Sequence, residues 1–241
     1  MGARPSDAVT ARRPRWRAYL LLSRVSNLPT VWSNVVAGTL AASLAPDWPA
    51  ALQVAAAASL FYTGGMFLND AFDAGIDRTA RPERPIPAGD VGRAEVFSVG
   101  GALLASGLLL LPRDRTVWLI GVALVAAILL YDVRHKGVRY APLIMGLCRG
   151  LVYCVAAAAA SMLTGAAIAG ATVMASYVAG LTVVAKLAGA RARWLVPMLI
   201  AGISLLDAAV IAVVSSAYDY ALLAAVGFPL TLVLQRVVPG D

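Results

Sequence analysis

The only concentrated carboxylates in the sequence lie in one short segment. One amide and three carboxylates there are spaced for a helix: Asn69, Asp70, Asp73 and Asp77. At about 100° per residue they fall within an arc of roughly 100°, so a helix would present their oxygens on one face. Magnesium prefers oxygen ligands and is commonly held by one or two carboxylates together with substrate phosphates. The spacing therefore predicts a magnesium site that a phosphate-bearing substrate completes.

An alternative interpretation is a solvated helix end whose acids pair with Arg78, Arg81 and Arg84. Exposed ion pairs contribute little to stability. Carboxylates repeated at i,i+4 also repel one another when no cation lies between them. The metal-binding interpretation is therefore favoured.

A stiff basic segment follows the acids. Residues 81–89 contain three prolines within six residues, which end any helix and hold the chain extended. Arg81 and Arg84 in this segment are suited to binding phosphate oxygens. Their alternative role is to fix the orientation of the chain in a membrane.

The elements that position these residues are predicted to cross a membrane. The chain of 241 residues is 60% apolar and 14% charged, with a mean hydropathy of +0.78, which a water-soluble core of this length does not need. Apolar stretches of about 17 to 25 residues recur along it, the length that a membrane-crossing helix requires. We therefore predict an all-α, polytopic transmembrane bundle of eight or nine helices. Its spans are expected at residues 18–44, 50–68, 94–111, 116–131, 141–161, 164–185, 194–214 and 218–236.

The placement of positive charge predicts the orientation of this bundle. Lys and Arg gather before the first span and in the second, fourth and sixth connections, whereas the alternate connections hold only Arg113 and Arg115. Under the positive-inside rule, the N-terminus and the even-numbered loops face the cytoplasm. The net charge of +7 is thus a topology signal, and no nucleic-acid partner is expected. We expect residues 1–17 to form a basic cytoplasmic segment and residues 18–241 one membrane domain. The high Ala and Arg content indicates a GC-rich bacterial genome, so a bacterial cell membrane is the expected location.

The acidic segment and its context resemble a known family, the UbiA superfamily of intramembrane prenyltransferases. Its first aspartate motif resembles the run Asn69-Asp70-x-x-Asp73-x-x-x-Asp77-Arg78 followed by Arg84-Pro85-Ile86-Pro87-x-Gly89. Its substrate-facing segment on the first helix resembles Arg24-Val25-Ser26-Asn27-Leu28-Pro29-Thr30. Its second cytoplasmic loop resembles the set Tyr131, Lys136, Arg139 and Pro142. The subgroup called EboC is most similar around Trp32-Ser33-Asn34, Gly146-Leu147-Cys148-Arg149 and Gly180-Leu181-Thr182.

The resemblance implies an enzyme that binds a prenyl diphosphate inside the helical bundle with Mg²⁺ and transfers its prenyl group to an acceptor that the sequence does not identify. It implies catalytic roles for Asp73, Asp77 and Lys136, and metal binding by the four oxygen-bearing residues of the first motif. The expected substrate contacts are Arg24, Asn27, Arg81, Arg84, Tyr131, Arg139, Arg149 and Lys186.

The family's second motif, Asp-x-x-x-Asp after the sixth helix, is absent. Beyond residue 140 the carboxylates are Asp207, Asp219 and Asp241. The expected place instead holds Lys186, Arg191 and Arg193. Our hypothesis is that one magnesium remains and that Lys186, with one of these arginines, neutralises the diphosphate directly. A changed reaction or an inactive binding role is the competing explanation.

Several of these residues have a second interpretation. Arg24 lies near the end of the first predicted helix, where snorkelling explains its charge equally well. Lys136 and Arg139 are equally interpretable as topology determinants. Arg149 lies inside a span, where a charge usually faces a cavity or a partner. Asp207 falls under the same rule and could pair with a cation from a neighbouring helix, but it matches no motif and is left out of the predicted site.

Other functions fit the sequence less well. A transporter would place acids within its spans, whereas the three aspartates of the motif cluster at one end. A CDP-alcohol phosphatidyltransferase would need Gly where Ala74 stands. A terpene cyclase or a phosphoribosyl transferase of the same superfamily, and a non-catalytic lipid-binding or transport protein, stay open as alternatives.

Overall fold

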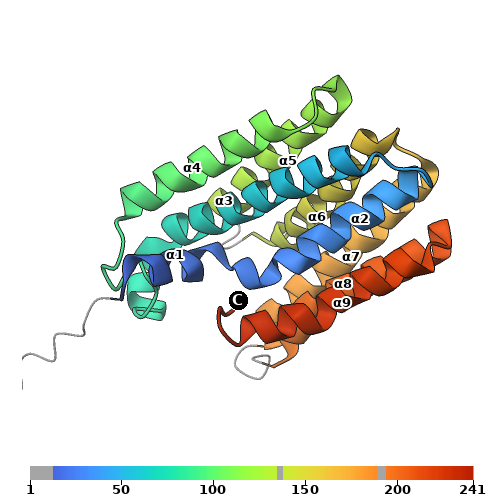
Figure 1. The fold of residues 1–241 in the computed structure, drawn as a ribbon. Coiled ribbons are helices and arrows are strands. Elements are labelled where there is room, and N and C mark those ends of the chain that lie inside the picture. The colour runs from blue at the N-terminus through green and yellow to red at the C-terminus, as the bar shows by residue number, and fades with distance from the viewer. Residues whose placement is uncertain (1–12, 135–137, 189–193, 241) are drawn as a thin grey trace, which may run out of the picture.

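The computed structural model describes residues 13–134, 138–188 and 194–240. These residues form nine α-helices and one short 3-10 helix, and no strand is found among them. In chain order they are α1 (Arg15–Ser23), η1 (Val25–Asn27), α2 (Leu28–Ala42), α3 (Trp48–Ala80), α4 (Arg93–Leu110), α5 (Arg115–Arg134), α6 (Ala141–Ala160), α7 (Gly165–Ala188), α8 (Leu195–Ser215) and α9 (Tyr218–Gln235). The helices run side by side in one bundle (Figure 1). Seven of them, α3 to α9, are long and apolar enough to cross a membrane, so the predicted all-α transmembrane bundle is confirmed.

The first predicted span is a broken helix. Helix α1 ends at Ser23, and Arg24 adopts left-handed backbone angles with φ 45° before the single turn of η1. Helix α2 then starts with Pro29 in its first turn, where the missing proline N–H costs nothing. The prediction of one unbroken helix over residues 18–44 is therefore wrong. The break matters because it brings Arg24 to Asp70 near the end of α3 and Asn27 to Tyr62 in the middle of that helix.

Helix α3 is the longest element and carries the acidic motif on its last turns. It begins at the N-cap Asp47, whose side chain accepts a hydrogen bond from the Ala50 N–H at 3.3 Å. It ends at Ala80, directly before the proline-rich segment that was predicted to stop it. Thirty-three residues extend about 50 Å, whereas the hydrocarbon of a bilayer is about 30 Å thick. The acids thus lie on a rigid extension of a membrane-crossing helix.

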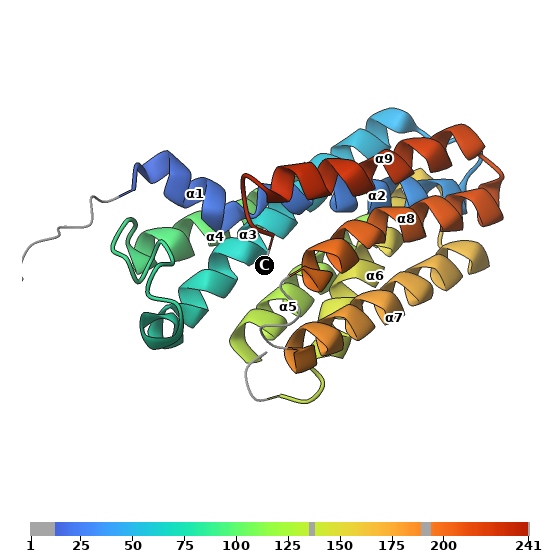
Figure 2. The same ribbon diagram turned by 90° about the horizontal axis from the view of Figure 1, so that it is seen from below.

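Helix α2 is at the centre of the bundle and contacts α3, α6, α7, α8 and α9. A view from below places α8 between α7 and α9 (Figure 2). Gly38 allows α2 to approach α6 closely, because a Cβ atom at this position would lie 2.7 Å from the carbonyl oxygen of Tyr153. This close packing brings polar side chains of α2 and α6 into contact inside the bundle.

Candidate active site

The oxygen-bearing side chains of the first motif form one buried group at the end of α3. Asn69, Asp70, Asp73 and Asp77 are all buried. The spacing predicted that they would share a helix face, and their common burial agrees. We call this end of the bundle the acidic end.

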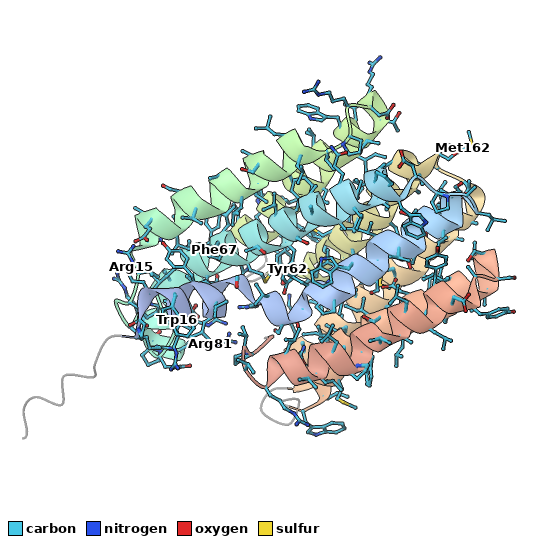
Figure 3. The ribbon with its side chains drawn as sticks, in the orientation of Figure 1. Arg15, Trp16, Tyr62, Phe67, Arg81 and Met162 are labelled. Atoms are coloured by element: carbon cyan, nitrogen blue, oxygen red, sulfur yellow. The ribbon has the colours of Figure 1, made fainter. Side chains whose placement is uncertain are left out.

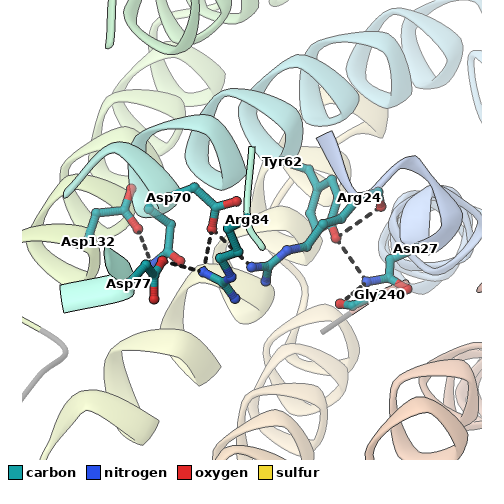
Figure 4. Close-up of polar contacts among 9 residues, drawn as sticks. Arg24, Asn27, Tyr62, Asp70, Asp77, Arg84, Asp132 and Gly240 are labelled. Carbon is teal, nitrogen blue, oxygen red and sulfur yellow. Dashed lines mark hydrogen bonds and ion pairs between the residues drawn. The ribbon is translucent and has the colours of Figure 1, made fainter. Parts of the chain in front are cut away.

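Two arginines from different segments bind the carboxylates of the acidic end (Figure 4). Arg84 donates from Nη1 to Asp70 Oδ1 at 3.0 Å and to Asp77 Oδ2 at 2.9 Å. Arg24 donates from Nη2 to the same Asp70 oxygen at 3.1 Å. The proline-rich segment positions Arg84, and the break between α1 and α2 positions Arg24. Both side chains are only about one seventh exposed, so these ion pairs are poorly screened by solvent.

The structure shows part of the alternative interpretation, in which arginines pair with the acids. Arg84 pairs with the acids, whereas Arg78 and Arg81 are exposed and form no ion pair among the described residues. Arg81 lies at the end of the bundle, away from the central Tyr62 (Figure 3). Within the described chain, no group of three or more Asp, Glu, His or Cys side chains is arranged to hold a metal ion. Arg84 thus bridges Asp70 and Asp77.

A fourth carboxylate that the sequence analysis missed faces the acidic end from α5. Asp132 is buried, and its Oδ1 accepts a hydrogen bond from Asn69 Nδ2 at 3.4 Å. The available signal was a carboxylate in the last turn of an apolar helix, directly after the predicted contact Tyr131. Asp132 therefore adds an oxygen donor from a second helix to the acids of α3.

Asp132, among these carboxylates, also lines a cavity of about 110 Å³. It lies between α2, α3, α5 and α6, and its wall is apolar except for a few side chains, chiefly Tyr62, Tyr131, Asp132 and Arg149. Apolar cavities of about 150 Å³ accept a benzene molecule, so this one has room for about one five-carbon unit. An apolar pocket with a few polar groups is the usual form of a ligand site.

Asn27 holds the break in place. Its Nδ2 donates to Tyr62 Oη at 3.0 Å and to the Gly240 carbonyl at 2.9 Å, and its Oδ1 accepts from Gln235 Nε2 at 2.8 Å. The C-terminal residues accordingly lie beside the break between α1 and α2 (Figure 1).

The remaining predicted contacts are spread over the bundle. Tyr131 lines the cavity, whereas Arg139 and Lys186 are exposed and form no ion pair with another described residue. Lys136, with Arg191 and Arg193 of the hypothesis about the diphosphate, lies outside the described residues.

Arg149 reaches from α6 to α2 inside the bundle. It donates to the Thr30 carbonyl at 3.2 Å, to Thr30 Oγ1 at 3.0 Å and to Asn34 Oδ1 at 2.9 Å. Asp207 does not pair directly with a cation in the part of the chain described, contrary to one interpretation of its sequence position. It accepts hydrogen bonds from neutral side chains of α2 and α6 instead.

These features define a class of protein, a membrane-embedded helical bundle with a charged end beside an apolar internal cavity. The chain belongs to the UbiA prenyltransferase family, because the model of that family matches residues 28–240. The resemblance seen in the aspartate motif is confirmed. The EboC-like subgroup stays a prediction.

Curated relatives match over part of their length. A digeranylgeranylglyceryl phosphate synthase of Ignicoccus hospitalis is 46% identical over 94 residues, which cover 39% of this chain and 30% of that protein. A 4-hydroxybenzoate octaprenyltransferase of Pectobacterium atrosepticum is 33% identical over 123 residues, which cover 47% of this chain and 42% of that protein. The matched part spans less than half the length of each relative.

Solved structures share the fold. A digeranylgeranylglyceryl phosphate synthase superposes with a TM-score of 0.61 at 19% identity, covering 92% of this chain and 98% of the other. A UbiA homologue from Archaeoglobus fulgidus, solved with DMAPP and Mg²⁺, superposes with a TM-score of 0.60 at 14% identity, covering 92% and 86%. At these identities the likeness shows a common fold.

Proposed function

We propose that this chain transfers a prenyl group from a prenyl diphosphate to an acceptor, in a magnesium-dependent reaction within the membrane. One observation carries the proposal: the arginine-paired acids at the end of α3 are linked through Asn69 to Asp132, which lines an apolar cavity. A prenyl diphosphate has the same division, with a charged head and an apolar tail. The names of the relatives, and the homologue solved with DMAPP and Mg²⁺, support this donor and this metal.

The side chains at the acidic end suit magnesium in their chemistry. All are hard oxygen donors, and a magnesium ion that also binds phosphates needs only one or two carboxylates. The residues that would hold it are Asn69, Asp70, Asp73, Asp77 and Asp132. Bound there, magnesium would neutralise charge on the departing diphosphate.

The protein's own residues would do the rest of the chemistry. Arg24 and Arg84 would donate to the diphosphate oxygens as negative charge develops on them. The bond between the prenyl C1 and oxygen breaks, and its electron pair leaves with the diphosphate. The acceptor's nucleophile forms the new bond to C1, and its proton passes to the released diphosphate. Phe61 and Tyr62 line the cavity, and aromatic rings there would suit an allylic cation.

The roles of the exposed cations stay predictions within this proposal. Lys186 would neutralise the far side of the diphosphate in place of the absent second motif. Arg81 and Arg139 would add contacts when substrate is bound. Asp73 and Asp77 keep the catalytic roles predicted for them, as does Lys136.

We also propose that the acidic end faces the cytoplasm, as the distribution of Lys and Arg indicates. Residues 18–241 would form one membrane domain behind a basic cytoplasmic segment of residues 1–17. A bacterial cell membrane is the proposed location.

The test is release of diphosphate by the purified protein from labelled prenyl diphosphates of graded length, with and without magnesium. Asp73→Asn is compared with Asp219→Asn, which makes the same charge change at an exposed site on α9. Release that needs magnesium and Asp73, together with label transfer to an acceptor, supports the proposal. A cyclised product formed without acceptor would indicate a terpene cyclase. Phosphoribosyl diphosphate is tested as a further donor, and release of diphosphate from it alone would indicate a phosphoribosyl transferase. Metal-dependent binding without release would contradict catalysis.

A further inference from the structure

The chain turns back at the end of α9 and returns to the break between α1 and α2. Backbone hydrogen bonds form this turn, among them the bond from the Val238 N–H to the Leu234 carbonyl at 2.9 Å. Residues 236–240, which we call the strap, then lie beside the start of α2 (Figure 1). Val238 and Gly240 are buried there, whereas the other strap residues are exposed. The strap thus contacts a part of the chain that lies 213 residues away in the sequence.

The strap and the residue before it hold one side-chain amide, that of Asn27. Gln235, the last residue of α9, donates from Nε2 to Asn27 Oδ1 at 2.8 Å. The Gly240 carbonyl accepts from Asn27 Nδ2 at 2.9 Å. The fit at Gly240 is close, because an added Cβ atom would lie 2.6 Å from Asn27 Oδ1 and 2.8 Å from Gln235 Nε2. Asn27 is only 3% exposed, so the docked strap fixes its amide.

A row of contacts leads from Asn27 to the acidic end (Figure 4). Asn27 Nδ2 also donates to Tyr62 Oη at 3.0 Å, and Tyr62 Oη donates to the Arg24 carbonyl at 3.4 Å. The Arg24 side chain then pairs with Asp70 at 3.1 Å. Left-handed backbone angles at Arg24 cost free energy, because its Cβ atom crowds the following carbonyl. Such angles persist where surrounding contacts fix them, and the bonds of Asn27 and Tyr62 supply such contacts.

The strap itself is weakly held. Val238, 7% exposed, is its only buried apolar side chain. The Gly240 carbonyl makes its one hydrogen bond beyond α9 among the described residues. Ordering a chain segment costs conformational entropy that is comparable with gains of this size. The strap is therefore suited to dock and undock, and anything that needs Asn27 in place favours the docked state.

We propose that the strap is a positioning element of the prenyl diphosphate site: docked, it holds Asn27 and, through it, Tyr62 and Arg24. The inference rests on the proposed function and adds a coupling between the strap and the binding of the donor. The strap residues and Gln235 are positioning residues, since they act through Asn27. Because coupling between two equilibria is reciprocal, a bound donor stabilises the docked strap by the same factor by which the strap favours the donor.

Donor kinetics test the coupling with matched variants. Gln235→Met removes one hydrogen bond to Asn27 at similar side-chain size, and Gly240→Ala forces a Cβ atom against the same amide. Arg236→Met and Pro239→Ala are the controls, because both side chains are exposed in the same segment. We expect the first two variants to raise the donor KM for diphosphate release about threefold to tenfold, the effect of one hydrogen bond, and the controls to leave it unchanged. Saturating donor should restore the wild-type kcat, whereas a loss of folded protein would lower kcat at unchanged KM.

Labelling of Val238→Cys measures docking without turnover. In a variant lacking Cys148 and Cys154, this thiol should react with a maleimide when the strap undocks, because position 238 is buried in the docked strap. Val237→Cys is the control, since Val237 is 77% exposed. A non-hydrolysable prenyl thiolodiphosphate with magnesium should slow the labelling of Val238→Cys about threefold to tenfold, the factor expected for KM. The labelling of Val237→Cys should not change.

A purely structural role for the strap would give different results. Unchanged donor KM in Gln235→Met and Gly240→Ala, with or without a loss of kcat, would overturn the inference. Equal labelling of Val238→Cys with and without saturating analogue would overturn it as well. Gln235→Met supplies the comparison if Gly240→Ala does not purify as a folded protein.

The proposed function is tested separately, because the labelling needs binding of the analogue and no turnover. Slower labelling of Val238→Cys in a protein that releases no diphosphate would contradict the proposed function alone. Diphosphate release by the wild type, together with strap variants that behave like the wild type, would contradict the inference alone. Calorimetry that detects no binding of the analogue would contradict both.

Discussion

Arg84 is the cation through which the acidic end is stabilised before any ligand binds. It joins Asp70 to Asp77, and all three side chains are largely shielded from solvent. We expect Arg84→Ala to lower the rate of diphosphate release about 100-fold, because one preorganised donor to the developing charge is lost. The variant should also lose about 3 kcal/mol of stability, since two carboxylates lose a buried partner.

Magnesium separates these two effects. The vacated carboxylates should bind the ion better, so magnesium should raise the melting temperature of Arg84→Ala more than that of the wild type. Thermal unfolding in detergent, with and without magnesium, measures this difference. Arg78→Ala is the control, because Arg78 is exposed on the same helix end. An equal response of both variants to magnesium would contradict metal binding by these acids.

Asp132 should contribute to the magnesium requirement from α5. It is buried against Asn69 and comes from α5, so it can bind a metal that α3 already holds. We expect Asp132→Asn to raise the magnesium concentration for half-maximal diphosphate release about tenfold. Titration of the activity with magnesium tests this, and Asp219→Asn should behave as the wild type.

The sequence predicted the positions of some functional residues and not of others. The spacing of the four acidic-motif residues predicted a shared helix, and the structure places all four on α3. Asp132 could not be recognised in this way, because its partner Asn69 is 63 residues away and the contact depends on how α5 packs. The network around Asp207 has the same cause, since its partners lie on α2 and α6.

At the scale of elements, the contact between α2 and α6 positions Arg149. Gly38 is tightly enclosed by α6, whereas Gly101 on α4 has no neighbouring atom within 4 Å of an added Cβ. We expect Gly38→Ala to cost about 1 to 3 kcal/mol, because the two backbones must move apart. Gly101→Ala should be neutral or stabilising by up to about 1 kcal/mol, since alanine favours a helix. Unfolding of both variants in the same detergent provides the test, and equal effects would contradict the tight packing.

Helix ends were predictable where the local sequence determines them, as at Ala80 before the proline-rich segment. The break at Arg24 was not. Left-handed backbone angles are usually marked by glycine, and here an arginine adopts them while its side chain binds Asp70. The signal is a long-range ion pair, which the local sequence does not contain.

At the scale of the whole molecule, the proposal requires the acidic end and the α2–α3 connection to lie on opposite sides of the membrane. Single cysteines would be placed at the exposed positions Arg81 and Ala45 in a variant lacking Cys148 and Cys154. An impermeant maleimide should label Arg81→Cys only from the cytoplasmic side and Ala45→Cys only from the other side. The reverse result would contradict the orientation, and labelling of both from one side would contradict the crossing by α3.

The central claim is that the acidic end and the cavity bind one molecule. An experimental structure with Mn²⁺ and a non-hydrolysable prenyl thiolodiphosphate tests it most directly, because manganese gives an anomalous signal. The account predicts a manganese peak at roughly magnesium-like distances, about 2.0–2.3 Å, from carboxylate oxygens of α3. It also predicts the diphosphate beside Arg24 and Arg84, and the first isoprenoid unit in the cavity beside Tyr62. A metal bound elsewhere, or a prenyl chain outside the cavity, would contradict it.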